Sequence, residues 1–543
     1  MIKEYEIDSM ETSLVEENSK NRYGQYFTPD IVAEFMIDLA EINPSSKILE
    51  PSSGEGVFLD ILTKRGYKNI TAYEIDPKLG NQFDFVRHES FVPASVEEGF
   101  DLVVGNPPYI RWKNLESELK DELSTSKLWN RYFNSLCDYL YIFILKSIKV
   151  LNDDGQLIFI CPEYWMNTTH SISLRNYMVQ NGYFESIYHF NETPIFSNAT
   201  VSVIIFKYIK SEDRTQKIKI IEYYKNKPLT SEILFDIKNT SPENSDIETF
   251  TVSQFEKNKR WLLTNQIEIE RINSFEKGCS TQLNTNQDLF SQSMDKSYPT
   301  IGDICEIGNG MVSGLDRAFQ LNGERLTEFE KSNTIDVIKA KDLGPFIHNR
   351  ITKCVFANDI KTEEELKSSC PNFYSKLISQ KERLEKRYQY DRKINFWEWV
   401  FLRNYNLFKS QEPRIFVPCK ERISNKDYFR FSYVLKGIFP TQDVTAIFKK
   451  ATTKESLFYI LAFLNNYRIF NWLKNKGIVK GNIVEFSEKP ISSIPFRKIN
   501  WDDEEEVGYH NRITLLAKSY VEENEDLVLK KINELLDKLL EVK

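Results

Sequence analysis

The sequence has no continuous apolar stretch of about eighteen residues, the length from which a membrane-spanning helix is expected. Its first residues, Met1 to Tyr5, lack the apolar run of a secretory signal. Histidine occurs only five times, and the seven cysteines are scattered without a Cys-x-x-Cys pair. These absences argue against a zinc site and a disulfide framework, so we expect buried, reduced thiols, no metal and a cytoplasmic location.

The charge of the chain is unevenly distributed along its length. A chain of 543 residues, 41% of them hydrophobic, can bury more than one core, and its net charge of −8 by itself disfavours a nucleic-acid partner. However, residues 331–500 contain 32 Lys and Arg against 17 Asp and Glu, a net charge of +15, while the remainder carries −23. This asymmetry predicts one polyanion-binding lobe, with a solvated lysine-rich surface as the alternative.

The most informative motif follows the apolar run Phe100 to Gly105, which is predicted to be a strand. It consists of Asn106, Pro107, Pro108 and Tyr109. Neither proline has a backbone N–H, so the motif presents an amide oxygen and carbonyls as a cluster of acceptors, followed by an aromatic ring. Such a cluster fits a flat group that carries an NH2, for example a nucleobase amine, although an ordinary strand-ending turn has the same composition.

A second pattern lies upstream of this motif. Residues 47–59 read as a buried strand, a turn with Gly54 and Gly56, and the start of a helix that reaches about Lys64. A further strand, residues 70–73, ends in Glu74, Ile75 and Asp76, where a carboxylate can accept hydrogen bonds from ribose hydroxyls. Glu55 inside the turn would repel a pyrophosphate. The pattern therefore predicts a nucleoside ligand without phosphates.

Together, these motifs resemble those of the gamma group of S-adenosylmethionine-dependent DNA methyltransferases, the restriction-modification enzymes that methylate the exocyclic N6 amine of adenine. The resemblance covers roughly residues 20–210, in the order of the family. It includes three further segments: Gly24 to Pro29 with the helix Ile31 to Leu39, the strand Gly155 to Pro162, and the hairpin Pro194 to Phe206. It implies an α/β, Rossmann-like methyltransferase sheet and S-adenosyl-L-methionine as the cofactor.

The resemblance also implies a role for individual residues. Asn106 to Tyr109 would be catalytic: the Asn106 side-chain oxygen and the Pro107 carbonyl accept the two amine hydrogens of a flipped adenine, Tyr109 stacks on the base, and Phe196 edges its pocket. The cofactor would contact Thr28, Glu50, Gly54, Gly56, Glu74, Ile75, Ser90, Phe91 and Asn106. Family members usually have Asp-Phe where this chain has Ser90-Phe91, so both Ser90 and the adjacent Glu89 are candidates to contact the cofactor's adenine.

The chain is expected to divide into an N-terminal extension (1–20), a catalytic domain (21–240), an α+β target-recognition domain (249–500) and a helical tail (501–543), with a linker at residues 236–246. Residues 301–319 resemble the opening of target-recognition domains in these methyltransferases. The basic lobe also contains an aromatic cluster, Phe396, Trp397 and Trp399. Its candidate DNA contacts are Arg403, Arg414, Lys420, Arg422, Lys476 and Lys480.

Leucines at helical spacing between Ile513 and Val542 predict an amphipathic helix that packs on its own domain; a coiled-coil dimer is the alternative to a monomer. The expected partner is double-stranded DNA, with a separate cognate endonuclease possible. A protein-glutamine or RNA-adenine methyltransferase remains an alternative, because both substrates present a planar amine. A fused nuclease and a non-catalytic DNA-binding subunit are disfavoured, because the sequence shows no convincing nuclease motif and the Asn-Pro-Pro-Tyr motif is intact.

Overall fold

The computed structural model describes residues 26–196, 202–225, 227–241, 243–280, 298–390, 392–424, 426–480, 482–523 and 527–541. These residues belong to two compact units, the first ending at Gln266 and the second beginning at Ile267. The predicted extension 1–20 and the beginning of the Thr-Pro segment, Gly24 and Gln25, lie outside the described residues. Within the described ranges, no helix is both long and apolar enough to cross a membrane.

A nine-stranded sheet forms the centre of the first unit, with the strand order β3-β2-β1-β4-β5-β7-β6-β8-β9. The first five strands in this order are parallel, and β7 and β9 run antiparallel to their neighbours. The strands are β1 (Ile48–Glu50), β2 (Ile70–Tyr73), β3 (Val86–Arg87), β4 (Phe100–Gly105), β5 (Leu151–Pro162), β6 (Gly182–His189), β7 (Val203–Lys210), β8 (Ile218–Tyr223) and β9 (Ile247–Val252).

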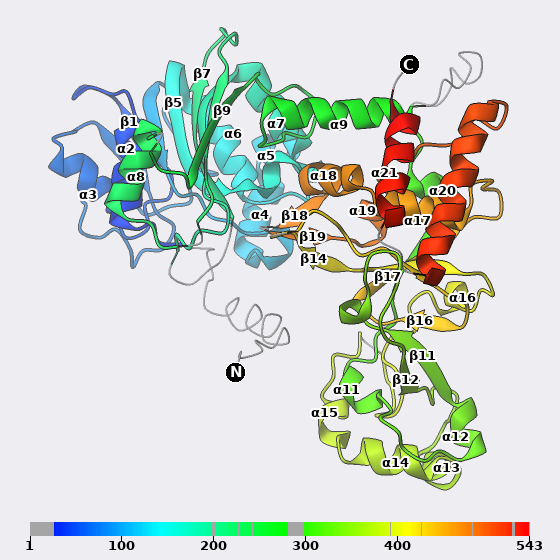
Figure 1. The fold of residues 1–543 in the computed structure, drawn as a ribbon. Coiled ribbons are helices and arrows are strands. Elements are labelled where there is room, and N and C mark those ends of the chain that lie inside the picture. Colours follow the sequence, from blue (N-terminus) through cyan, green and yellow to red (C-terminus); the bar gives the residue numbers. More distant parts are fainter. Residues whose placement is uncertain are drawn as a thin grey trace. The chain divides into compact units, whose positions relative to one another are not determined.

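Helices cover both faces of this sheet (Figure 1). The central strands β1 and β4 are nearly continuous apolar runs, because a parallel strand between two helical layers is buried on both sides. On one face, α2, α3 and α8 share a core with the strands, whereas α6 packs on β5 and α7 on β6. The helices are α2 (Asp30–Asp38), α3 (Val57–Lys64), α4 (Ser117–Thr125), α5 (Lys127–Tyr132), α6 (Leu140–Val150), α7 (Ile172–Asn181) and α8 (Ser231–Asn239). The predicted α/β fold class is confirmed.

The end of the first unit differs from the predicted boundary at residue 240. Residues 236–246, the predicted linker, contain the end of α8 and its connection to β9. Strand β9 then pairs along the whole of β8, from Ile218↔Val252 to Tyr223↔Ile247. The polar composition of 236–246 thus marks a surface connection inside the first unit, and α9 (Gln266–Cys279) spans the division between the units.

The second unit combines three small sheets with short helices, which is the predicted α+β composition. The sheet orders are β10-β17-β13-β15, β12-β11-β16 and β14-β19-β18. The strands are β10 (Cys305–Asn309), β11 (Thr334–Ile338), β12 (Thr352–Val355), β13 (Arg414–Pro418), β14 (Lys420–Arg422), β15 (Ser432–Val434), β16 (Ile438–Pro440), β17 (Val444–Lys449), β18 (Ile478–Lys480) and β19 (Ile483–Glu485). The helices before α17 are α10 (Ile301–Ile304), α11 (Asp316–Phe319), α12 (Glu328–Ser332), α13 (Glu363–Ser369), α14 (Pro371–Ile378), α15 (Lys381–Glu385) and α16 (Tyr405–Phe408).

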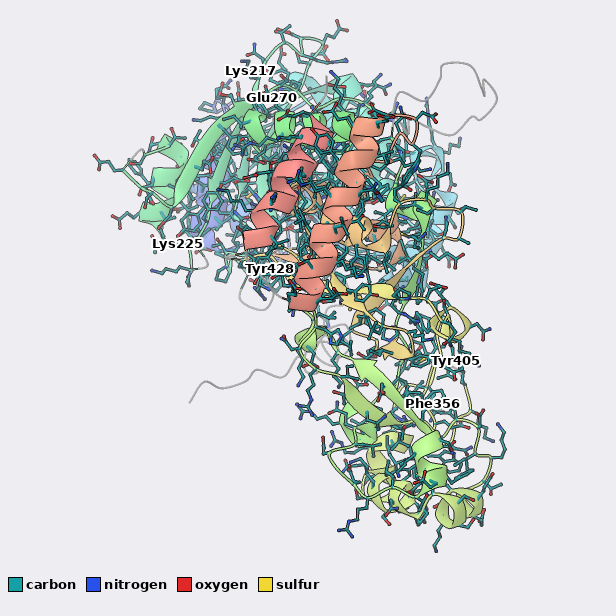
Figure 2. The ribbon with its side chains drawn as sticks, turned by 45° about the vertical axis from the view of Figure 1, so that its right-hand side comes forward. Lys217, Lys225, Glu270, Phe356, Tyr405 and Tyr428 are labelled. Carbon is teal, nitrogen blue, oxygen red and sulfur yellow. The ribbon has the colours of Figure 1, made fainter. Side chains whose placement is uncertain are left out.

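Aromatic residues form much of the core of this second unit. The side chains of Phe396, Trp397 and Trp399 are at most 5% exposed and belong to one apolar cluster. The rings of Phe356 and Tyr405 pack together beside it, with centroids 5.5 Å apart (Figure 2). The aromatic cluster of the basic lobe therefore stabilises the core and does not present rings at the surface.

The C-terminal tail forms two helices where the sequence predicted one between Ile513 and Val542. Helix α20 (Glu504–Glu523) packs on α17 (Leu457–Leu464), and α21 (Leu527–Leu540) packs on α20. The remaining helices of the unit are α18 (Tyr467–Lys476) and α19 (Glu488–Ser492). The apolar face of the tail is thus covered within its own unit, as expected for an amphipathic segment.

Candidate active site

The glycine turn between β1 and α3 is held by an acidic residue from the next strand. Gly54 and Gly56 have φ of +55° and +88°, which L-residues with a Cβ rarely adopt. Glu74, at the end of β2, accepts hydrogen bonds from the backbone N–H of Gly54 at 2.7 Å and of Asp76 at 2.9 Å. A carboxylate has further lone pairs, so Glu74 can orient the turn and still accept a ribose hydroxyl.

A pocket opens at the carboxyl ends of these parallel strands. Ligands bind at this edge of open α/β sheets. Of the predicted cofactor residues, Gly56 is absent from the pocket lining and instead precedes the first turn of α3. The other eight line the pocket: Thr28, Glu50, Gly54, Glu74, Ile75, Ser90, Phe91 and Asn106.

Several further lining residues were not predicted as cofactor contacts from the sequence. Tyr26 and Ser53 belong to the Thr-Pro and glycine-turn segments, so their positions could have suggested them. Leu119 of α4, together with Tyr139 and Phe143 around α6, comes from segments that carry no local motif. Glu89 also lines the pocket, so Glu89 and Ser90 both remain candidates to contact the adenine of a bound cofactor.

The pocket contains two buried carboxyl groups that suit a cationic ligand. The side chain of Glu50 is 1% exposed, and its Oε2 atom has no hydrogen-bond partner. Burial and the nearby Glu74 raise the pKa of Glu50 well above its usual value. Burial also raises the pKa of Glu74. A ligand with a positive charge and ribose hydroxyls would satisfy these groups, which is the chemistry of S-adenosylmethionine.

The side-chain amide of Asn106 is oriented by the segment that precedes α2. Its Nδ2 donates hydrogen bonds to the Tyr26 carbonyl at 2.6 Å and to the Thr28 hydroxyl at 3.1 Å. Because both N–H groups have partners, the Oδ1 atom is the acceptor that remains at the end of β4. This atom accepts a hydrogen bond from the Tyr109 hydroxyl, which also lies 2.8 Å from the Ile160 carbonyl.

Three aromatic rings gather beside this amide. The rings of Tyr26 and Tyr109 are stacked, and Phe196 is tilted against both, with centroids 5.5 Å from Tyr26 and 6.4 Å from Tyr109. The structure therefore brings together the two predicted base-pocket residues and adds Tyr26. Residues 197–201 of the predicted hairpin follow Phe196 and lie outside the described part of the chain.

The loop after Tyr109 is tied to a carboxylate that sequence reasoning missed. Arg111 and Asp138 form an isolated bridge between their backbones, and the Tyr164 hydroxyl donates to Asp138 at 2.5 Å. Burial raises the pKa of Asp138 to about 6. Because Asp138 is distant from Tyr109 in sequence, no local pattern indicates that it supports the Asn-Pro-Pro-Tyr motif.

One predicted DNA contact is wrong. Arg414 has a relative exposure of 0%, and its guanidinium donates to the backbone carbonyls of Phe408, Ser410 and Glu412. A buried guanidinium that is held by backbone carbonyls of its own chain cannot reach a DNA phosphate or base edge. Arg414 instead holds the segment before β13, because its three carbonyl partners lie within six residues of it.

The other basic candidates differ in their surroundings. Lys476 forms an ion pair with Glu276 at 2.7 Å, and the half-exposed Arg403 lies over the Phe401 ring. Lys420 and Arg422 are exposed on β14. Arg422 and Lys480 are both paired with Ile483, on the two sides of β19. The β14-β19-β18 sheet thus brings three of the six predicted positions together.

The glycines near residues 301–319 were expected to permit a close approach to a DNA backbone. Gly314 has φ of +76°, but a Cβ built on it would lie 2.8 Å from Arg387 Cδ. A Cβ on Gly310 would lie 2.0 Å from the Thr441 carbonyl oxygen. At these two positions, the close approach is to the protein's own chain.

Comparison with known proteins identifies the family to which the chain belongs. The model of the Eco57I restriction-modification methylases matches residues 57–196, a span that includes Asn106 to Tyr109. Over 527 residues, the chain is 44% identical to the type II methyltransferase M.HindII of Haemophilus influenzae, an alignment that covers 97% of this chain and 99% of that protein. The chain belongs to the type II restriction-modification methyltransferases.

Further relatives agree with this assignment. The type II methyltransferase M.HincII of Haemophilus influenzae is 42% identical to this methyltransferase. The alignment covers 97% of this chain and 99% of M.HincII. Among solved structures, the type IIL restriction-modification enzyme MmeI, determined in complex with DNA, superposes with a TM-score of 0.58 at 12% identity, covering 97% of this chain and 73% of that one. The similarity to MmeI, at this low identity, shows the fold alone. The predicted membership in the restriction-modification methyltransferases is confirmed.

Proposed function

We propose that this methyltransferase transfers the methyl group of S-adenosyl-L-methionine to the exocyclic N6 amine of an adenine in double-stranded DNA. The observation that carries the proposal is the orientation of Asn106, whose Nδ2 is committed to Tyr26 and Thr28. Its Oδ1 is therefore available to accept a hydrogen from a planar amine once the Tyr109 hydroxyl turns to the Ile160 carbonyl. Together with the Pro107 carbonyl, it would polarise the amine as it attacks.

Different residues around the pocket would bind different parts of the cofactor and of the target base. Glu50 and Glu74 would bind the cationic and ribose parts of the cofactor, and Asn106 lies between this pocket and the aromatic rings. When bound, the cofactor supplies an activated methyl group on its sulfonium, so no general base is needed to create the electrophile. Tyr109 and Phe196 would hold the flipped base by stacking and edge contacts.

The second unit is the proposed target-recognition domain. Its exposed Lys420 and Arg422 on β14 would neutralise DNA phosphates. We further propose that the protein acts as a cytoplasmic monomer, with any cognate endonuclease encoded as a separate chain. Light scattering of the purified protein, with and without duplex DNA, tests whether the protein is monomeric.

The experiment that tests the reaction is sequencing of modified bases in DNA from cells that express the full chain, with cells expressing the Asn106→Ala variant as the control. We expect N6-methyladenine at one defined sequence in the first sample and none in the second. Digestion and mass spectrometry of the same DNA distinguish N6-methyladenine from N4-methylcytosine. Methylcytosine, or labelling of peptide or RNA but not of duplex DNA in parallel assays, would overturn the proposal.

A further inference from the structure

A further polar group lines the pocket on the side of β3, three strands away in the sheet from β4 and the Asn106 that follows it. Ser90, which follows β3, donates a hydrogen bond from its hydroxyl to Oε1 of Glu122 at 2.8 Å. Glu122 belongs to α4, which follows the catalytic motif in the chain, and its neighbour Leu119 on the same helix lines the pocket. A carboxylate from a distant segment is thus placed directly behind the Ser90 hydroxyl.

The loop that carries Ser90 is fixed by a buried lysine. The Lys146 ammonium of α6 donates hydrogen bonds to the carbonyls of Phe91, Val92 and Ala94, at 2.5, 2.8 and 2.8 Å. Burial lowers the pKa of Lys146 to about 8, against an opposing effect from Glu122. Three bonds from one ammonium hold three carbonyls of this loop in place, so Ser90 and Phe91 occupy fixed positions at the pocket wall.

The hydrogen-bonding capacity of Ser90 can be counted. A serine hydroxyl has one hydrogen and two lone pairs, and its hydrogen points to the Glu122 carboxylate. Tyr139 also interacts with Ser90 through a side-chain hydrogen bond. Even where the phenol is the donor, at least one lone pair of Ser90 remains. A ligand atom that meets it must be a donor, because Ser90 has no second hydrogen to offer.

The surroundings of Ser90 suit the base of a nucleoside. Phe91, Phe143 and Leu119 line this end of the pocket with apolar surface that can pack on a flat ring. The carboxyl groups of Glu50 and Glu74 lie along the wall built by β1 and β2, where a cation and a ribose would bind. Since the reacting methyl group must face Asn106, the base of the cofactor would lie at the Ser90 end.

We propose that Glu122 fixes the Ser90 hydroxyl as a hydrogen-bond acceptor and thereby makes the cofactor pocket select a 6-amino purine over a 6-oxo purine. This inference rests on the proposed use of S-adenosylmethionine. An adenine presents an NH2 to the remaining Ser90 lone pair, whereas hypoxanthine presents a carbonyl oxygen that would face it without a hydrogen between them. Glu122 acts through Ser90 and is a positioning residue.

The test is calorimetric titration of the full-length protein with S-adenosylhomocysteine and with S-inosylhomocysteine, which differ at purine position 6 and in the hydrogen that the 6-oxo purine carries on N1. We expect the wild type to bind the adenosyl compound at least about 100-fold more tightly, since the wrong partner leaves a buried acceptor facing an acceptor. In Glu122→Gln, the Ser90 hydroxyl can reverse its direction, so the ratio of the two affinities should fall at least about tenfold.

Two further variants separate positioning from general damage. Asp121→Asn removes the adjacent, exposed carboxylate of α4 and should leave the ratio unchanged. In a Ser90→Ala background, Glu122→Gln should change the ratio no further, because its intermediary is gone. Thermal melting of each variant reports whether it is folded.

The possible outcomes distinguish this inference from the proposed function. If the wild type binds neither compound, the proposed cofactor is wrong. If it binds the adenosyl compound but takes the inosyl compound equally well, the selectivity inference is overturned while the cofactor proposal stands. An equal loss of affinity for both compounds in Glu122→Gln would likewise overturn it, because that result marks a purely structural role.

Discussion

The ring of Tyr26 stacks on the ring of Tyr109, with centroids 5.4 Å apart and planes inclined by 23°. Atoms in stacked rings approach to about 3.5–4.0 Å, so a third ring between these two would need a centroid separation near twice that value. A target base that stacks on this face of Tyr109 must therefore displace Tyr26. The proposed position of the base is thus occupied by the protein's own side chain in this structure.

Removing this ring should favour extrusion of the base. In Tyr26→Ala, no ring competes with the base for Tyr109, so the equilibrium should shift toward the flipped state by part of a stacking energy of roughly 1–3 kcal/mol. The measurement is fluorescence of 2-aminopurine placed at the target position, once that sequence is known. Tyr26→Phe, which keeps the ring, is the control and should match the wild type. An unchanged signal in Tyr26→Ala would show that the two rings do not compete.

Asn106→Ala should abolish methyl transfer while largely retaining cofactor binding. The variant loses an acceptor for the target amine, which costs on the order of 10²-fold or more in turnover by analogy with oxyanion-hole deletions. Single-turnover assays measure the rate, and titration with S-adenosylhomocysteine measures the binding. Asn114→Ala, in the exposed segment after the motif, provides the matched control. Turnover close to that of the wild type would remove Asn106 from the mechanism.

Tyr109 combines a ring face with a hydroxyl that bonds the Ile160 carbonyl at 2.8 Å. Tyr109→Phe keeps the face and should retain substantial activity, whereas Tyr109→Ala loses a stacking contribution of roughly 1–3 kcal/mol. Turnover and 2-aminopurine fluorescence of both variants distinguish the contribution of the Tyr109 ring face from that of its hydroxyl. If the variants are equally impaired, the hydroxyl and its bond to Ile160 are more important than the ring.

The basic lobe should determine the salt dependence of DNA binding. Neutralising Arg403, Lys420 and Arg422 should weaken binding and reduce the slope of log affinity against log salt by about one unit for each phosphate that the protein no longer neutralises. Arg414 is left unchanged because it is buried. Lys217→Gln, an exposed lysine of the first unit, is the control (Figure 2). S-adenosylhomocysteine affinity should not change, and an unchanged slope in the triple variant would exclude this surface from DNA binding.

A buried histidine should make stability depend on pH. His189 contacts Glu163 at 2.5 Å and Glu222 at 3.1 Å. Burial alone would lower the pKa of His189, but the two carboxylates raise it from 6.5 to about 10. The folded protein therefore holds a proton that the unfolded chain releases above about pH 6.5. This stabilisation is fully present below that pH and is lost as the pH rises toward 10.

The measurement is thermal melting between pH 6.5 and 10. The wild type should lose several degrees of melting temperature over this range relative to His189→Gln, in which this residue cannot titrate. His170, an exposed histidine, serves as the control, and His170→Gln should follow the wild type. Parallel curves for the wild type and His189→Gln would contradict a protonated His189.

The sequence alone determined the parallel part of the sheet and the candidate active site, because both depend on local patterns. Apolar runs that end in Glu50, Glu74 and Asn106 read as parallel strands, and parallel strands bring their carboxyl ends to one edge. Their end residues therefore meet in one pocket even though they lie far apart in the chain. The glycine turn could also be predicted from the sequence, since glycine is the residue that most readily adopts the positive φ of Gly54 and Gly56.

Only the tertiary structure decided which long side chains are buried and which distant segments meet. Arg414 resembles a surface cation in sequence, but packing of the second unit encloses it and its own backbone supplies its acceptors. Glu122 reaches Ser90 across 32 residues because α4 folds back over the pocket, and no periodicity encodes that contact. Local propensity specifies a strand, a turn or a helix face, whereas burial and long-range hydrogen bonds depend on how these elements pack together.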